Sequence, residues 1–178
     1  MLGAICRSGN VTDKEIGTVL SSMVYIVDTR EKSNSHILEF FKENGIPYKV
    51  EKLDSGDYSV EVTANGFESL SKSVIVERKN SLTEISGNFT KNRERFEREF
   101  NRATENKQSM HLLVETATWK SVFNGNYRSQ MSPKSMVSSL LTFSIRYNVP
   151  VWFVGKAESG RLIHELLYYG VREKLKNL

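Results

Sequence analysis

Short apolar runs alternate with segments of helical periodicity along most of the chain, and this alternation limits the folds that are open to it. The runs are rich in β-branched and aromatic residues, which predicts strands over residues 23–27, 47–53, 58–63, 73–77, 111–115 and 150–154. Helical spacing predicts helices over about 37–44, 90–107, 133–147 and 158–175. The turn signal Asn65-Gly66 makes one strand pair antiparallel. We therefore expect an α/β fold with a mixed sheet flanked by helices.

The domain organisation follows from the length of the chain and from the lack of sequence signals for a domain boundary. A chain of 178 residues fits one domain, and no repeat, low-complexity tract or Pro/Gly-rich linker divides it. We expect a leader over residues 1–21, followed by a single domain over 22–178. Within the leader, Thr12 and Glu15 are spaced as the capping box of a short helix.

Composition excludes several classes of protein. Hydrophobic residues make up 39% and charged residues 26%, which is typical of a globular protein rather than a disordered one. The single cysteine, Cys6, cannot form an internal disulfide, and no apolar run approaches the roughly 20 residues that a bilayer requires. These features favour a cytoplasmic protein. The net charge of +4 favours a polyanionic partner, although many proteins of other kinds are equally basic.

Three acidic residues, Asp28, Asp57 and Glu77, stand where predicted strands begin or end. Carboxylates that are brought together repel one another, and a bound cation relieves this repulsion. Oxygen ligands without a histidine or cysteine partner suit Mg²⁺ or Mn²⁺ better than zinc. The three residues are therefore candidate metal ligands.

The tripeptide Glu77-Arg78-Lys79 adds a cation to this group. On a strand, residues two apart point to the same face, so Glu77 and Lys79 share one site and Arg78 points away. The carboxylate can hold a metal while the ammonium orients a water molecule or stabilises a charged transition state. Taken alone, Glu-x-Lys is also common as an ion pair on surface strands.

Three motifs that follow one another along the chain resemble those of a known family. They are Asp28-Thr29-Arg30-Glu31, Gly56-Asp57-Tyr58 and Val76-Glu77-Arg78-Lys79, and Arg95-Phe96 and Leu113-Val114-Glu115 follow them. In these residues the chain resembles the XPF-type nuclease domain, a PD-(D/E)xK domain of structure-specific endonucleases. The resemblance covers about residues 23–155.

This resemblance implies a restriction-endonuclease-like fold that cuts DNA beside branches, flaps or junctions with Mg²⁺ or Mn²⁺. It also implies roles for individual residues. Asp57 and Glu77 would be metal ligands, Asp28 would lie beside them, and Lys79 would be the catalytic lysine.

Four further positions complete the expected site. Glu31 would add to the acidic pocket, and Arg78 would support the site or contact the scissile strand. The family motif usually continues to an aspartate at the position of Thr83, so this chain departs from the pattern there. Glu84, one residue later, is the candidate substitute.

Basic residues suggest where DNA would bind. Lys91, Arg95, Arg98 and Arg102 form one stripe of the predicted helix, where a solvated face with intrahelical ion pairs is the alternative interpretation. For Lys91 and Arg95 we predict DNA contact.

The loop before the helix at 133–147 holds an aromatic residue beside a cation. Tyr127, Arg128 and Lys134 could stack a base and contact phosphates, or could lie on an ordinary surface connection. We name all three as candidate DNA-binding residues. The three histidines are scattered without ligand spacing, and we interpret them as incidental.

The last predicted helix carries an apolar stripe of Leu162, Ile163, Leu166, Leu167 and Val171. Such stripes usually face a core, but a surface for self-association is an alternative. Because the resemblance implies pairing of domains, we expect a homodimer through the last two helices.

The function predicted from the sequence is therefore a metal-dependent DNA endonuclease. A nuclease-inactive DNA-binding subunit that pairs with an active partner is the alternative, and Thr83 gives it some support. Against it, Asp57, Glu77 and Lys79 are all present.

Overall fold

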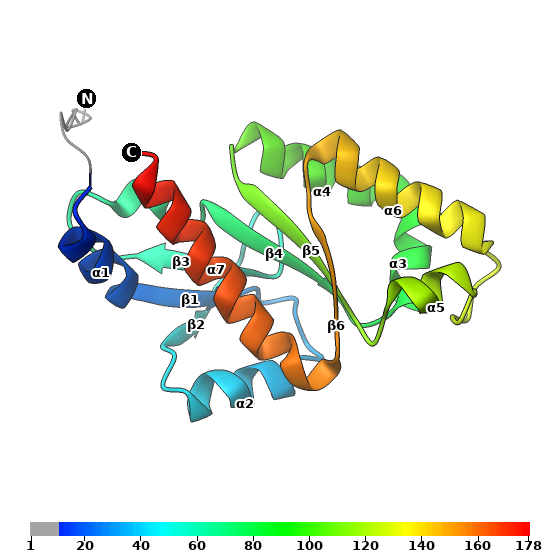
Figure 1. Ribbon diagram of the computed structural model, residues 1–178, viewed down its shortest axis with the longest axis horizontal. Helices are drawn as coiled ribbons and strands as arrows, with labels where there is room; N and C mark the ends of the chain where they lie inside the picture. The colour runs from blue at the N-terminus through cyan, green and yellow to red at the C-terminus, as the bar shows by residue number, and fades with distance from the viewer. Residues whose placement is uncertain (1–10) are drawn as a thin grey trace.

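Six strands form one mixed sheet at the centre of the computed structural model, which describes residues 11–178 (Figure 1). The strands are β1 (Met23–Val27), β2 (Tyr48–Val50), β3 (Tyr58–Val62), β4 (Val74–Lys79), β5 (Ser109–Glu115) and β6 (Val151–Val154). The helices are α1 (Asp13–Ser21), α2 (Ser35–Glu43), α3 (Leu82–Phe89), α4 (Arg93–Glu105), α5 (Trp119–Phe123), α6 (Pro133–Tyr147) and α7 (Ser159–Lys176). Two short 3₁₀ turns, η1 (Glu68–Leu70) and η2 (Lys156–Glu158), complete the elements. The α/β fold predicted from the sequence is confirmed.

The strand order β2-β1-β3-β4-β5-β6 places an antiparallel strand inside the sheet. β3 runs antiparallel to both β1 and β4, whereas β1 pairs with β2, β4 with β5 and β5 with β6 in parallel. Because β3 runs the opposite way, its first residue lies at the edge where β1, β4 and β5 end. The chemistry-bearing residues at these strand ends are thereby brought to one edge of the sheet.

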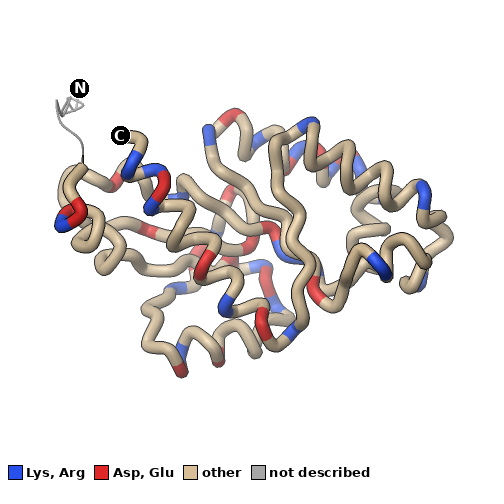
Figure 2. Tube along the Cα trace, in the orientation of Figure 1, with Lys and Arg blue, Asp and Glu red and all other residues tan. Residues whose placement is uncertain are grey.

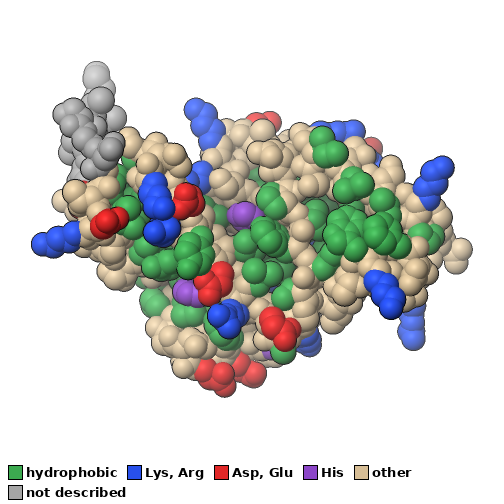
Figure 3. Space-filling view, in the orientation of Figure 1, with side chains coloured by type: hydrophobic (Ala, Val, Ile, Leu, Met, Phe, Trp, Pro, Cys, Tyr) green, Lys and Arg blue, Asp and Glu red, His purple; other side chains and the backbone are tan. Residues whose placement is uncertain are grey.

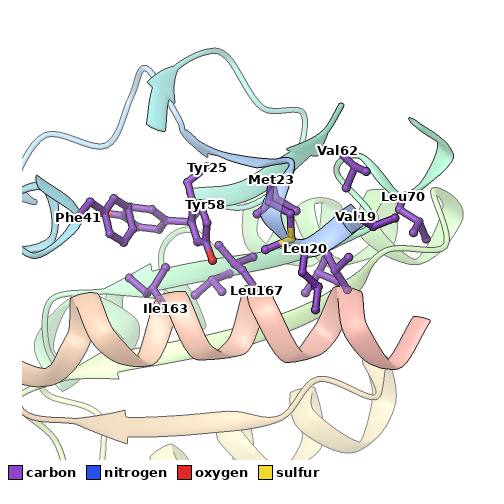
Figure 4. Close-up of a cluster of buried hydrophobic side chains, with 14 of the residues drawn as sticks. Val19, Leu20, Met23, Tyr25, Phe41, Tyr58, Val62, Leu70, Ile163 and Leu167 are labelled. Atoms are coloured by element: carbon purple, nitrogen blue, oxygen red, sulfur yellow. The ribbon is translucent and has the colours of Figure 1, made fainter. Parts of the chain in front are cut away.

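The first face of the sheet is covered by α1, α2 and α7, as the close-up of its core shows (Figure 4). Tyr25 and Tyr58 of the sheet pack against Ile163 and Leu167 of α7 in this core. Ile163, Leu167 and Val171 are fully buried. The interpretation of the stripe at residues 162–171 as core is therefore confirmed for these three side chains, which are not available for self-association.

The second face is covered by α3, α4, α5 and α6, whose core contains a cluster of phenylalanines among aliphatic side chains. Phe89, Phe96, Phe100 and Phe143 pack with ring centroids 4.7 to 5.9 Å apart. Tilted and edge-to-face pairs at such distances add to the stability that burial alone provides. The helices that border the site are therefore held by a rigid core.

The structure differs from the sequence prediction in the segment after β4, where two helices replace the one expected over 90–107. Ser81 begins α3 early by accepting a hydrogen bond from the Glu84 amide at 3.3 Å. Thr90 then leaves helical geometry, with φ −115° and ψ −93°, and separates α3 from α4. The loop expected before the helix at 133–147 also contains a helix, α5, which Thr118 caps.

Part of the expected leader packs with the domain. The capping box of Thr12 and Glu15 is present, and Ile16, Val19 and Leu20 of α1 are buried in the first core. Cys6, expected to form no disulfide, lies outside the described residues. No helix within residues 11–178 combines the length and the apolar character that a membrane crossing needs.

Candidate active site

Asp57 lies in the tight connection that leads into β3, between the ends of β1 and β4. Its Oδ2 accepts a hydrogen bond from the backbone amide of Arg78 at 2.8 Å, and its own amide donates to the Val76 carbonyl at 2.9 Å. Gly56 precedes it with φ +74°, and a Cβ there would lie 3.2 Å from Ile75 Cβ. The backbone can pass this close to β4 only because residue 56 is glycine.

Glu77 and Lys79 point from β4 toward α3 and α4, whereas Arg78 between them points to the other face. Both side chains are buried, and Lys79 Nζ donates to Glu77 Oε1. Glu77 Oε2 is buried without a hydrogen-bond partner among residues 11–178. Lys79 Nζ also lies 5.5 Å from the centre of the Phe96 ring. The predicted pairing of Glu77 with Lys79 on one face is confirmed.

The side chains of Asp57, Glu77 and Lys79 lie in a buried, charged environment that shifts the pKa of each. Burial raises the pKa of Asp57 to about 7, and nearby Glu31 adds to the rise although Lys79 opposes it. Burial and the charge of Asp57 raise the pKa of Glu77 well above its usual range. Burial lowers the pKa of Lys79, but Glu77 and Asp57 more than offset this, so the net shift is upward. Lys79 is therefore an ammonium beside two carboxylates that are costly to ionise together.

Arg78 lies on the first face of the sheet, with its side chain fully buried. Nε and Nη2 each donate to Glu115 at 2.8 Å, and Nη1 donates to Glu31 at 2.6 Å. Nη2 also donates to the Ser33 carbonyl at 2.9 Å and to Asn80 Oδ1 at 2.5 Å. These contacts agree with the supporting role expected for Arg78, and its contact with the scissile strand stays a prediction.

Asp28 and Glu31 both lie at this edge of the sheet, but only Glu31 lines the cleft. Asp28 does not line the cleft described below, and its carboxylate accepts hydrogen bonds from the amides of Arg30 and Leu53 and from the Arg30 guanidinium. Burial raises the pKa of Asp28, but these partners more than offset it, and the pKa lies below its usual range. Glu31 lines the cleft as expected. Asp28 is thus occupied in holding the loop around Leu53.

A cleft of about 290 Å³ opens between this edge of the sheet and the helices α3 and α4. Its lining residues are Arg30, Glu31, Asp57, Glu77, Arg78, Lys79, Glu84, Asn88, Asn92, Arg95, Phe96, Glu99 and Arg102. Sequence reasoning assigned no role in the site to Arg30, Asn88, Asn92 or Glu99. The spacing of Glu99 from Arg95 and Arg102 puts the three on one face of α4, and this signal was available in the sequence.

The other predicted DNA-binding residues lie outside this cleft. Lys91, Arg128 and Lys134 are exposed, and Tyr127 is half-buried with its hydroxyl donating to the Met131 carbonyl at 3.1 Å. The Arg128 amide donates to Thr83 Oγ1 at 3.1 Å, so Thr83 anchors the loop before α6. Of the residues predicted to bind DNA, only Arg95 faces the cleft.

Glu84 stands closer to the site than Thr83. It lines the cleft, its Oε1 lies 3.9 Å from Lys79 Nζ, and its Oε2 accepts a hydrogen bond from the Asn80 amide at 2.9 Å. Glu84 therefore stays the candidate for the carboxylate that the family pattern has at position 83.

The donor set fits a hard divalent cation. Asp57 and Glu77 offer carboxylate oxygens into one cleft, and Glu77 Oε2 has no partner among the described residues to satisfy it. Within residues 11–178, no three His, Cys, Asp or Glu side chains gather as a metal-binding cluster. Mg²⁺ commonly takes one or two protein carboxylates and fills its remaining positions with water and phosphate oxygens. The two carboxylates are thus enough to bind Mg²⁺, with water and phosphate oxygens as its other ligands, but they do not form a site in which every ligand comes from the protein.

The fold has relatives among solved structures. XPF from Aeropyrum pernix superimposes with a TM-score of 0.63 at 20% sequence identity, over 84% of this chain and 65% of that one. Its complex with DNA superimposes with a TM-score of 0.61 at 19% identity, over 84% of this chain and 66% of that one. The chain therefore spans about two thirds of the length of these relatives. No curated protein sequence matches the chain.

The family follows from the sequence. The model of the ERCC4 domain matches residues 27–166, which is well over half of the chain and includes every strand-end residue described above. The resemblance to XPF-type nucleases inferred from the three motifs is thereby confirmed, as is the restriction-endonuclease-like sheet that it implied. This chain belongs to the ERCC4 domain family, whose members include the XPF-type nuclease domains.

Proposed function

We propose that the protein is a divalent-metal-dependent endonuclease that hydrolyses phosphodiester bonds of DNA, with branched, flap or junction DNA as its substrate class. The observation that carries the proposal is the grouping of Asp57, Glu77 and Lys79 in one cleft of an ERCC4 domain. An inactive subunit has no use for two buried carboxylates whose pKa values are both raised, because such an arrangement costs stability.

Asp57 and Glu77 are the residues that would hold Mg²⁺ or Mn²⁺. When bound, the ion would activate a coordinated water molecule and stabilise negative charge on the phosphate. Asp28 acts at a distance in this proposal, because its oxygens already accept hydrogen bonds from Arg30 and Leu53. Its role is to hold the loop that flanks Asp57.

Lys79 contributes a fixed positive charge. Its pKa lies above the usual value, so it is protonated at neutral pH and does not act as a general base. An ammonium at this place orients the attacking water and stabilises the charge that develops on the phosphate. The hydrogen bond to Glu77 and the contact with Phe96 fix its position.

The cations of the cleft suggest the path of the DNA strand. Arg30, Arg95 and Arg102 line the cleft, and Arg30 and Arg102 also line the adjoining groove of about 440 Å³. Basic and acidic positions are interspersed along the chain (Figure 2), and acidic residues such as Glu99 line the cleft beside these cations, so the cleft is not wholly basic. One solved relative, XPF from Aeropyrum pernix, is a complex with DNA. We place the phosphates of the cut strand along Arg95, Arg102 and Arg30.

A homodimer remains part of the proposal, through α6 rather than α7. Apolar side chains gather over α5, α6 and β6 (Figure 3), and among them Leu141 is 45% and Ile145 80% exposed. Trp119, Phe123 and Trp152 extend this apolar surface. Exposed apolar surface of this extent is typical of a protein interface, and a second copy of the chain is the partner we propose.

A cleavage assay tests the function. Flap, fork, four-way junction, single-stranded and plain duplex DNA are incubated with the protein in Mg²⁺, Mn²⁺ or EDTA. We expect cutting of at least one branched substrate that EDTA abolishes. Lys79→Ala should slow it by about 10²-fold or more, which is the usual effect of losing one charge-stabilising group. Binding of branched DNA without cutting in either metal would instead establish the inactive DNA-binding subunit.

A further inference from the structure

The buried side of the active-site strand contains a second polar group that the proposed chemistry does not use. It consists of Arg78, Glu115, His36 and Ser159, which come from β4, β5, α2 and the first turn of α7. Glu115 is 1% and Ser159 0% exposed. Burying so many polar groups costs free energy unless each finds a partner, so their arrangement requires a reason.

The contacts within this group form a chain that ends at Arg78. His36 Nε2 lies 2.8 Å from Glu115 Oε1 and 3.1 Å from Ser159 Oγ. Both oxygens of Glu115 then accept hydrogen bonds from the Arg78 guanidinium at 2.8 Å. Because a carboxylate only accepts, His36 must donate from Nε2.

The Glu115 carboxylate is held in its ionised form. Burial raises its pKa, but hydrogen bonds from Arg78 and His36 more than offset this, and the pKa lies below the usual range. The planar guanidinium meets the carboxylate with two parallel bonds, the arrangement that gives an arginine both affinity and orientation. Glu115 therefore fixes the rotation of the Arg78 side chain as well as its place.

Arg78 transmits this position to the cleft through its own backbone. Its amide donates to Asp57 Oδ2 at 2.8 Å, and its neighbours along β4 are Glu77 and Lys79. A strand whose side chain is clamped on one face cannot rotate about its axis on the other. The side chains that face the cleft thus depend on the clamp behind them.

We propose that Glu115 and His36 are positioning residues of the active site, which act through Arg78. The proposal rests on the endonuclease function proposed above. It gives a role to Glu115 at the end of β5, and it corrects the interpretation of His36 as incidental. Residues that hold the ligands of a metal in this indirect way commonly change metal affinity or activity by about 10–100-fold when replaced.

The first test measures the clamp itself, in the metal-free protein. In Glu115→Gln one carboxylate oxygen becomes an amide that donates, so it opposes the Arg78 guanidinium. Hydrogen exchange at the Arg78 amide, followed by NMR, should then be at least about 10-fold faster, because its bond to Asp57 loosens. The amide of Val74, at the far end of the same strand, should keep its exchange rate. Equal Arg78 exchange in Glu115→Gln and wild type would overturn the proposal.

The second test measures function, with a control for stability. His36→Phe removes the donor to Glu115, and His164→Phe removes a partly buried hydrogen bond of 2.7 Å to Tyr25 in the same helix layer. With Mn²⁺ and a branched substrate, we expect His36→Phe to lower kcat about 10-fold at unchanged KM. It should weaken Mn²⁺ binding as well, whereas His164→Phe leaves both at wild-type values. His36→Gln, whose amide can donate to the same carboxylate, should recover most of the loss.

The outcomes separate this proposal from the function on which it rests. If wild type cuts DNA, Lys79→Ala does not, and His36→Phe equals His164→Phe in kcat and Mn²⁺ affinity, the positioning role is wrong and the endonuclease stands. If wild type neither cuts DNA nor binds Mn²⁺, the endonuclease function is wrong and the positioning role falls with it.

Discussion

The Arg78 guanidinium and the Glu115 carboxylate form a two-pronged ion pair across β4 and β5, with Nε–Oε1 and Nη2–Oε2 distances of 2.8 Å. Both side chains are buried, so removing the arginine leaves the Glu115 carboxylate buried without its main counter-charge. We expect Arg78→Leu to lower the free energy of unfolding by about 3–5 kcal/mol, as loss of one member of a buried pair usually does. Urea unfolding measures this change.

Arg172→Leu is the matched control, because Arg172 pairs with Glu173 at 3.5 Å on the exposed side of α7. Exposed pairs contribute at most about 1 kcal/mol. An equal loss of unfolding free energy in the two variants would show that burial of the Arg78 pair does not increase its contribution to stability.

The stability of the metal-free protein should fall as the pH rises. The pKa of Asp57 is about 7 in the folded protein and near 3.8 in an unfolded chain, so the folded state binds more protons between these values. Its contribution is therefore favourable in acid and is lost as the pH approaches 7. In EDTA, the free energy of unfolding should differ less between pH 5 and pH 7.5 for Asp57→Asn than for wild type. Each tenfold difference in proton affinity between the folded and unfolded states corresponds to about 1.4 kcal/mol.

A divalent cation should reduce the same difference in wild type, because it offsets the repulsion between the ionised forms of Asp57 and Glu77. Mn²⁺ should therefore raise the melting temperature more at pH 7.5 than at pH 5. In Asp57→Asn this rise should be small at both values. A rise of the same size in the variant would mean that the ion binds elsewhere.

Glu84, rather than position 83, should matter for cleavage. Its carboxylate lines the cleft 3.9 Å from Lys79 Nζ, whereas Thr83 bonds to the Arg128 amide outside it. Glu84→Gln should slow the cutting of DNA by about 10-fold or more, within the range found for residues that hold catalytic groups. Thr83→Val should cut at the wild-type rate. The reverse order of rates would place the family carboxylate position back at residue 83.

The salt dependence of DNA affinity should distinguish the arginines of α4 that contact phosphates from the one that does not. Each phosphate contact contributes about 0.9 to the log–log slope of affinity against salt on duplex DNA. Arg95→Ala and Arg102→Ala should each lower that slope by about one contact, because both residues line the cleft. Arg98→Ala should leave it unchanged, since Arg98 lies outside the cleft, 3.9 Å from Glu94. Binding measured by fluorescence anisotropy over a series of salt concentrations gives the slopes.

The oligomeric state distinguishes the two helices that were expected to pair. Ile145 on α6 is 80% and Tyr169 on α7 52% exposed. Sedimentation should show a dimer at micromolar concentration that Ile145→Asp converts to a monomer and Tyr169→Asp leaves intact. A wild-type monomer would remove the dimer from the proposal, and dissociation by Tyr169→Asp alone would move the interface to α7.

The sequence predicted the strands better than the helices. Each strand is a short β-branched or aromatic run, and such runs are recognisable because two-sided burial demands them. The break between α3 and α4 was missed because Thr90 has no strong turn signal of its own. α5 was missed because five residues are too few for helical periodicity to show.

For the site, spacing placed Glu77 and Lys79 on one face because strand geometry alone decides this. Partners that come from distant segments could not be found in that way. His36 and Glu115 are 79 residues apart, and only the packing of α2 against the end of β5 joins them. Asp28 was expected among the ligands, but its carboxylate accepts a hydrogen bond from the Leu53 amide. This contact depends on the path of a loop, which no local sequence pattern reveals.

The antiparallel strand in the middle of the sheet also determines when the residues of the candidate site can meet during folding. Asp57 reaches Glu77 only after β3 has inserted between β1 and β4, and Glu115 reaches Arg78 only after β5 has joined. Contacts between segments this far apart in sequence form late, because loop closure must precede them. A nascent or partly unfolded chain therefore carries these acidic residues without bringing them together, and the proposed cutting of DNA would begin only once the sheet is complete.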